Sequence, residues 1–249
     1  MKRILIASLF ILLLSHEVTC GYVILDMMPN AFDDQYLGCG SKMDKEAPKL
    51  LQKEKSDPQF NKSWEVAKDK WKTKAKYVNI TGFKEEYGIA VVLYTMHTPI
   101  YSSLNNNVRT AGKSTDYYMK SFHFKALHFY LTRALQLLTR GCKQRLTTYR
   151  GTRVAFNVSA EMRFGQFASS SRNKTKAQRF GNETLFTITS CWGADIQKLS
   201  EFPGEEEVLI PVFEKFQRVA QRGKLVTLRT TGKRCSYFNC AYIRRAEEE

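Results

Sequence analysis

The feature that most constrains the fold is a change in residue pattern near Gly141. Before it lie stretches with helical character, and the strongest, from Thr115 to Arg140, repeats apolar residues at helical spacing. This stretch opens at Ser114 and closes at Gly141, residue types that are common at helix ends. After Gly141 come short runs that are rich in β-branched and aromatic residues. Helices followed by strands predict an α+β fold.

The same patterns give the expected ranges. We expect one domain over residues 21–249, with a helical part of about 21–141 and a β-rich part of about 142–245. The helices are predicted at 45–55, 61–76, 84–94 and 115–140, and the strands at 146–149, 164–168, 184–190, 207–213 and 225–230.

Residues 1–20 have the pattern of a secretory signal peptide. Lys2 and Arg3 precede an apolar run that ends at Leu14, and a short polar tail closes at Cys20. No later segment has the roughly eighteen consecutive apolar residues of a membrane-spanning helix. The last residues lack the hydrophobic tail of a lipid-anchor signal. We therefore expect a secreted protein without a membrane anchor.

Cysteine usage agrees with export. One of the six cysteines ends the leader, and the other five allow two disulfides and one free thiol. Cys142 follows the strongest helix and Cys191 follows a predicted strand, so we expect these two to be bonded. Cys39 is expected to pair with Cys240 or Cys235, and the sequence does not distinguish these partners. Sequons for N-glycosylation lie at Asn61, Asn79, Asn157, Asn173 and Asn182.

The chain is strongly basic, with a formal net charge of +15. The leader carries Lys2, Arg3 and Glu17, so its removal lowers the charge by one, to +14. Such a charge favours acidic partners. A secreted polyanion-binding protein is therefore one alternative function.

Several common catalytic motifs are absent from the sequence. There is no H-E-x-x-H and no C-x-x-C, so no metal site is expected. Glycine-rich phosphate loops and the G-x-S-x-G elbow are missing too. His97, His123 and His128 do not show the H-E-x-x-H spacing. His123 and His128 lie on the long predicted helix among aromatic residues and are interpreted as structural. Cysteines held in disulfides cannot act as nucleophiles.

Three segments place polar groups at the ends of predicted strands. They are Arg150-Gly151, the serine run 169–171, and the acidic turn that precedes Val208. If the turn is extended at residues 205–207, Glu205 and Glu207 share one face at a separation of roughly 6 to 7 Å. Paired carboxylates also occur in retaining glycosidases, a remote alternative.

An arginine, an S-x-S and an E-x-E in this order resemble the R-S-E class of mono-ADP-ribosyltransferases. Residues 122–134, FHFKALHFYLTRA, resemble the helical signature of the vertebrate secreted and ecto-enzymes that modify arginine on target proteins. Residues 26–36 and 235–240 are similar to the two ends of that family's domain. The resemblance extends over essentially the whole chain after the leader.

The resemblance implies a helical N-terminal part packed on two mostly antiparallel sheets, with NAD in a cleft between them. The implied reaction transfers ADP-ribose from NAD to arginine side chains of extracellular or secretory-lumen proteins and releases nicotinamide. NAD is then a substrate, and no metal or nucleic acid takes part. Arg150, Ser169 and Glu207 are implied as catalytic, and Glu205 as the residue that binds the acceptor arginine. The implied NAD contacts are Arg150, Gly151, Phe167, Ser169, Tyr94 and Phe202.

The chemistry requires residues of these types. Loss of nicotinamide leaves positive charge on the ribose, which a fixed carboxylate at Glu207 stabilises. Ser169 is expected to orient that carboxylate, Arg150 to bind phosphate or ribose oxygen, and the Gly151 backbone to hold the nicotinamide amide. Glu205 can hold a guanidinium in a forked pair. A NAD glycohydrolase, in which water replaces arginine, is the alternative enzyme.

Overall fold

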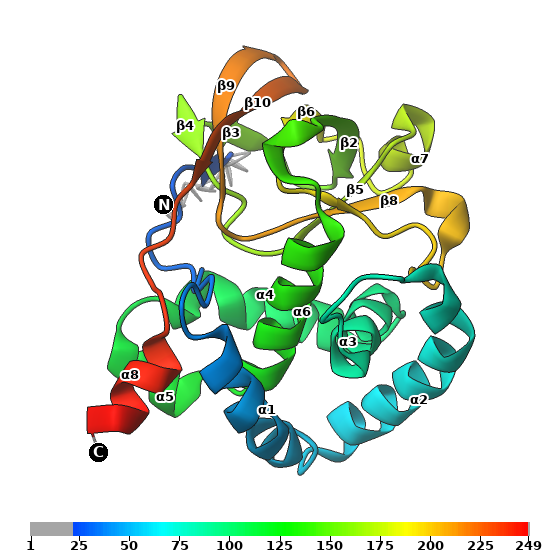
Figure 1. Cartoon of the computed structure of the whole chain (residues 1–249). Coiled ribbons are helices and arrows are strands. Elements are labelled where there is room, and N and C mark those ends of the chain that lie inside the picture. The colour runs from blue at the N-terminus through cyan, green and yellow to red at the C-terminus, as the bar shows by residue number, and fades with distance from the viewer. Residues whose placement is uncertain (1–21, 249) are drawn as a thin grey trace, which may run out of the picture.

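Helices and strands separate both along the chain and in space (Figure 1). The computed structural model describes residues 22–248, and the predicted signal peptide lies outside them. The helices of the first part lie below the sheet in Figure 1 and confirm the α+β class. They are α1 (Gly40–Glu54), α2 (Pro58–Lys74), α3 (Glu85–Thr95), α4 (Pro99–Ala111), α5 (Thr115–Ser121) and α6 (Lys125–Leu138), with a 3-10 turn η1 (Ala75–Tyr77).

The main sheet has eight strands in the order β4-β9-β10-β6-β2-β5-β8-β7. Neighbouring strands are antiparallel except β10 and β6, which run parallel. A separate parallel pair joins β1 (Val23–Leu25) to β3 (Phe156–Val158). The strands of the main sheet are β2 (Leu146–Thr152), β4 (Glu161–Met162), β5 (Ala168–Ser171), β6 (Thr184–Ser190), β7 (Ala194–Asp195), β8 (Glu207–Ile210), β9 (Glu214–Arg222) and β10 (Leu225–Arg234).

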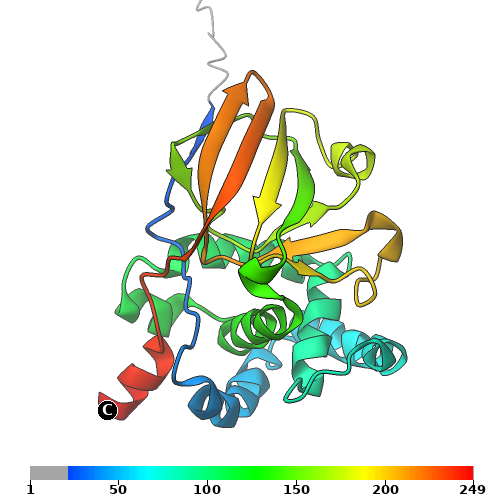
Figure 2. The same ribbon diagram turned by 45° about the horizontal axis from the view of Figure 1, so that its top comes forward.

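The sheet bends sharply between β2 and β5. These strands meet at a single residue pair, Tyr149 and Ser171, whereas β2 and β6 pair along seven residues. Figure 2 shows the consequence, because β8 (gold) runs across the direction of β6 (yellow) and β10 (orange-red). The two halves correspond to the two expected sheets, and the strands with the candidate site residues meet at the bend.

One predicted helix is in fact two. The predicted helix 115–140 is interrupted at residues 122–124, between α5 and α6. Phe122 takes extended backbone angles and is buried at 1% exposure, with its ring tilted by 40° against that of Phe32. The carboxylate of Glu54 then accepts bonds from the backbone N–H groups of Ala126 and Leu127, at 2.6 and 3.2 Å. A side chain from α1 thus satisfies the free donors at the start of α6.

Other ranges shift or were not predicted. The strand predicted at 164–168 is wrong, since β5 begins where that range ends and Gly165 has a φ of +67°. The side chain of Arg163, just before it, is fully buried in an ion pair with Asp33. The strand predicted at 184–190 is confirmed with the same bounds. The elements that the sequence did not indicate include α4, β9, the short helix α7 (Lys174–Gln178) and α8 (Ala241–Glu248).

Two disulfides join distant parts of the chain. Cys142 bonds Cys191, as expected, and links the chain after α6 to the end of β6. Cys39 bonds Cys240, which leaves Cys235 as a free thiol. The second bridge joins the start of α1 to the start of α8, so the C-terminal segment returns from the sheet to the helical layer (Figure 1).

Candidate active site

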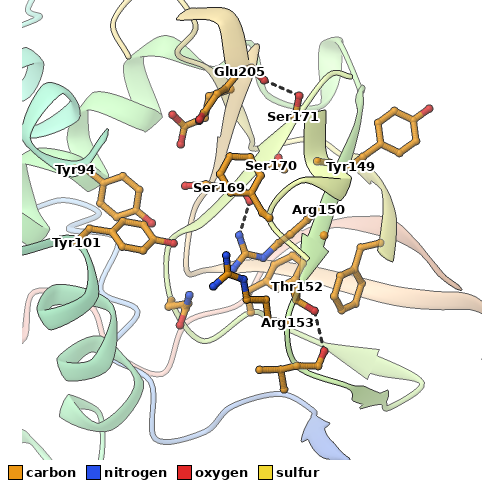
Figure 3. A pocket seen from close by; sticks show the side chains of 18 of the residues that line it. Tyr94, Tyr101, Tyr149, Arg150, Thr152, Arg153, Ser169, Ser170, Ser171 and Glu205 are labelled. Atoms are coloured by element: carbon orange, nitrogen blue, oxygen red, sulfur yellow. Dashed lines mark hydrogen bonds between the residues drawn. The ribbon is translucent and has the colours of Figure 1, made fainter. Parts of the chain in front are cut away.

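A cavity of about 1010 Å³ lies between the helical layer and the bend of the sheet. Its walls come from the end of α3, from α4, and from strands β2, β5 and β8. The expected site residues Arg150, Gly151, Ser169, Glu205 and Glu207 all line it, together with Tyr94 and Phe202. Figure 3 shows Arg150 pointing toward Ser169, with Tyr94 and Tyr101 on the helical side.

Arg150 and Gly151 lie at the end of β2 that faces α7. The guanidinium of Arg150 donates to the backbone carbonyl of Ser169 at 2.5 Å. At Gly151 an added Cβ would lie only 2.3 Å from the carbonyl oxygen of Ala177. The glycine is therefore required for the close approach of α7 to β2, whatever else its backbone binds.

Strand β5 carries the serine run. Ser170 donates its hydroxyl to the carbonyl of Val208 at 2.7 Å, and Ser171 donates to the carbonyl of Glu205 at 2.6 Å. These bonds fix β5 against β8 and against the acidic turn. Ser169 lines the cavity. Its hydroxyl bonds the carboxylate of Glu207, and this bond lowers the pKa of Glu207.

The acidic turn is not extended, so the expected backbone is wrong. Residues 203–205 form a 3-10 turn, and Glu206 adopts the left-handed region with φ 52° and ψ 49°. Glu205 and Glu207 nevertheless both line the cavity. Glu206 is absent from the lining, and its carboxylate bonds the ammonium of Lys176 at 2.6 Å. The turn therefore aims two of its three carboxylates at the cavity.

Glu207 is the most buried of the three, with 6% of its surface exposed. The hydroxyl of Ser200 donates to its Oε2 at 3.0 Å. Burial raises the pKa of Glu207, while bonds from Ser169 and Ser200 lower it. Neighbouring Glu205 raises it and Arg150 lowers it to a smaller extent. The site thus holds a carboxylate in partly desolvated surroundings, where its charge acts more strongly than in water.

Glu205 is more open to solvent. Burial raises its pKa, and the nearby His97 lowers it. The ring of His97 packs edge-on against Phe202 with 4.2 Å between centroids, and both line the cavity. His97 thus belongs to the site, a role that the sequence did not indicate.

Tyr94 and Phe167 occupy different layers. The Tyr94 hydroxyl donates to the carbonyl of Phe167 and accepts from the amide of Asn105, both at 3.0 Å. Tyr94 borders the cavity, whereas the ring of Phe167 is fully buried beside Tyr94 and His128 and does not line it. The Phe167 side chain therefore supports the cavity wall from behind.

The charged groups of the cavity are separated. Figure 3 shows Glu205 apart from Arg150 and Arg153, with the serines between them. A third guanidinium, that of Arg109, comes from α4, which the sequence did not indicate. Such a cavity suits a substrate that has an anionic part and develops positive charge elsewhere.

Residues 22–248 contain no group of three or more His, Cys, Asp or Glu side chains that could hold a metal ion. No helix within this range is both long enough and apolar enough to span a membrane.

The fold and the cavity together define the class of ADP-ribosyltransferases. Residues 25–236 match the family model described as NAD:arginine ADP-ribosyltransferase. The chain belongs to this family.

Individual relatives agree. The chain is 45% identical over 234 residues to ecto-ADP-ribosyltransferase 5 of Homo sapiens, covering 88% of this chain and 80% of the relative. It is 40% identical over 244 residues to human GPI-linked NAD(P)(+)–arginine ADP-ribosyltransferase 1, covering 88% and 74%. The crystal structure of the mono-ADP-ribosyltransferase ART2.2 superposes with a TM-score of 0.80 at 40% identity, covering 88% of this chain and 99% of ART2.2. A mutant of ART2.2 in complex with NAD gives the same TM-score at 38% identity and the same coverage.

Proposed function

We propose that this chain transfers ADP-ribose from NAD to arginine side chains of target proteins and releases nicotinamide. One observation carries the proposal. The turn at residues 203–207 directs Glu205 and Glu207 into the cavity and directs Glu206 away, to Lys176. One enclosed carboxylate and one more open carboxylate provide two different chemical functions.

Glu207 stabilises the positive charge that forms on the ribose as nicotinamide leaves. At about 4 Å and an effective dielectric near 20, its attraction is worth roughly 4 kcal/mol. That corresponds to about a thousandfold in rate. The hydroxyls of Ser169 and Ser200 orient the carboxylate, so little reorganisation is needed during the reaction.

Glu205 binds the acceptor. Its greater exposure allows a guanidinium on another protein to reach it, and a carboxylate can hold a guanidinium with two parallel bonds. Such a pair directs a guanidinium nitrogen toward the ribose carbon. Arg150 binds the phosphates of NAD, and Phe202 and Tyr94 border the space for the nucleotide. We propose that residues 21–249 act as one catalytic domain.

The proposal is tested with labelled NAD and two small acceptors. Agmatine carries a guanidinium, and 1,4-diaminobutane is a matched diamine without one. We expect labelled ADP-ribosyl-agmatine and no adduct of the diamine. A NAD glycohydrolase would instead give free ADP-ribose as the sole labelled product with either acceptor present. No nicotinamide release under any condition would contradict the proposed function altogether.

We propose that the mature protein is exported and modifies extracellular or secretory-lumen proteins. The predicted leader and the two disulfides support this location. The human relatives are named ecto- and GPI-linked enzymes. The test is expression in animal cells, followed by assay of medium, washed membranes and lysate. We expect the activity in the medium, and activity confined to membranes would contradict the expectation of no anchor.

A further inference from the structure

Arg109 projects from α4 toward the cavity and has no part in the roles above. Its helix belongs to the helical layer, whereas Arg150 belongs to the sheet. The cavity therefore receives guanidinium groups from both of its walls.

The position of Arg109 is fixed by the turn before it. Asn105 lies four residues earlier, on the same face of α4. Its amide donates to the hydroxyl of Tyr94, which donates to the carbonyl of Phe167, next to the start of β5. This buried chain of bonds connects α4 through α3 to the strand that carries Ser169. The backbone of Arg109 is thus held at a defined place on the cavity wall.

The two guanidinium groups have neutral partners. Arg109 donates to the side-chain amide oxygen of Asn106, and Arg150 donates to the backbone carbonyl of Ser169. Within residues 22–248, no ion pair joins either arginine to a carboxylate.

The charge of Arg150 acts on Arg109. Burial lowers the pKa of Arg109, Tyr101 raises it, and the charge of Arg150 lowers it to a smaller extent. Arg109 and Arg150 thus bring like charges to the same cavity, and neither forms an ion pair with a carboxylate of the described residues. An anion bound between the two guanidinium groups would reduce the repulsion between them. It would also accept hydrogen bonds from N–H groups that otherwise donate only to neutral oxygens.

We propose that Arg109 and Arg150 together bind the diphosphate of the substrate, Arg109 from α4 and Arg150 from β2. This inference rests on the proposed function, because the diphosphate is that of NAD. Each guanidinium presents a planar fork of donors that matches phosphate oxygens. Contact from both walls positions the nucleotide across the bend of the sheet, so that its ribose faces Glu207. Arg109 is therefore a substrate-binding residue that sequence patterns did not indicate.

The test measures binding of ADP-ribose, which has the diphosphate and lacks nicotinamide, by titration calorimetry. The variants are R109Q, R109K and the matched control R222Q, which removes the same charge from an exposed position at the end of β9. We expect R109Q to weaken binding at least tenfold and R222Q to leave it within twofold. R109K is expected to lie between, since it retains the charge and loses the fork. Nicotinamide riboside, which has no phosphate, serves as the second ligand, and R109Q should not change its affinity.

Two results would overturn the inference. One is unchanged ADP-ribose affinity in R109Q or, if that variant does not fold, wild-type affinity in R109K. The other is an equal loss in R109Q and R222Q, which would indicate bulk charge only. Either result leaves the proposed function standing if the wild type still releases nicotinamide from NAD. A wild type that binds ADP-ribose but never releases nicotinamide contradicts the proposed function and not the role of Arg109 in phosphate binding.

Discussion

The hydroxyl of Ser200 donates to the carboxylate of Glu207 at 3.0 Å, and the same oxygen accepts the backbone N–H of Phe202 at 3.1 Å. One buried serine thus connects the beginning of the acidic turn to the carboxylate at its end. The bond needs the turn to reverse within a few residues, which the left-handed conformation of Glu206 permits.

Substitution S200A is expected to lower kcat for nicotinamide release about tenfold, because a lost hydrogen bond to a charged group is worth roughly 1.5 kcal/mol or more. It should also change the pH profile. Glu207 acts ionised, its pKa is raised by burial, and the Ser200 bond lowers it. Loss of the bond raises the pKa further, so the acidic limb of kcat/KM moves to higher pH. The control is S63A, a buried serine of α2 outside the cavity lining, and superimposable S200A and wild-type profiles would refute the role of Ser200.

Substitution E205Q is expected to separate transfer from hydrolysis. Glu207 acts whether the acceptor is water or guanidinium, whereas Glu205 is assigned to the guanidinium alone. Loss of the forked pair should cost about 2 to 4 kcal/mol in transfer and leave NAD hydrolysis nearly unchanged. The measurement is the ratio of ADP-ribosyl-agmatine to free ADP-ribose. An equal loss of both products would place Glu205 in the NAD-cleaving step and contradict this division of roles.

Glu54 is expected to make folding stability depend on pH. Burial raises its pKa to about 8 from the ordinary 4.5, although the N–H groups of Ala126 and Leu127 oppose this. The folded state therefore holds this proton more tightly than the unfolded state does. The resulting stabilisation is complete below pH 4.5 and is lost as pH rises toward 8.

Thermal unfolding between pH 5 and 7.5 checks this dependence. The window avoids Lys125, whose pKa burial lowers to about 8 and whose opposite contribution begins near that value. We expect the wild-type midpoint to fall over this window by several degrees more than that of E54Q, which cannot ionise. Parallel curves for the two proteins would show that Glu54 does not titrate in this range.

The parts of the fold that follow from local pattern could be predicted. The strand at 184–190 follows from the residue types within it. The bond between Cys142 and Cys191 was expected because each cysteine directly follows a predicted helix or strand. The break before α6 could not be predicted, because its cap is Glu54, 72 residues before Ala126. Helix α4 was not predicted because it contains three consecutive asparagines, which usually favour turns. In the fold the side-chain amide of Asn105 donates to the hydroxyl of Tyr94 and does not bond the local backbone.

The site, too, has residues that local pattern indicates and residues that only the tertiary fold brings in. The expected residues Arg150, Ser169, Glu205 and Glu207 lie at strand ends and line one cavity, although the acidic turn has a different backbone from the expected one. Ser200 and Arg109 were not indicated. Ser200 contacts Glu207 from behind the lining, Arg109 lines the cavity from α4, and both placements depend on the tertiary fold.

The most direct test of the central claim is the rate of nicotinamide release from NAD by E207Q, with E206Q as the matched control. Both variants replace a glutamate of the same turn by its amide, but Glu206 bonds Lys176 and lies outside the cavity lining. We predict that E207Q loses about two to four orders of magnitude in this rate, consistent with the Coulomb estimate for one fixed carboxylate. E206Q should remain within a few-fold of wild type. If E207Q retains more than about a tenth of the wild-type rate, its loss is far smaller than the roughly thousandfold estimated for this carboxylate. That result would contradict the assignment of Glu207 as the catalytic carboxylate.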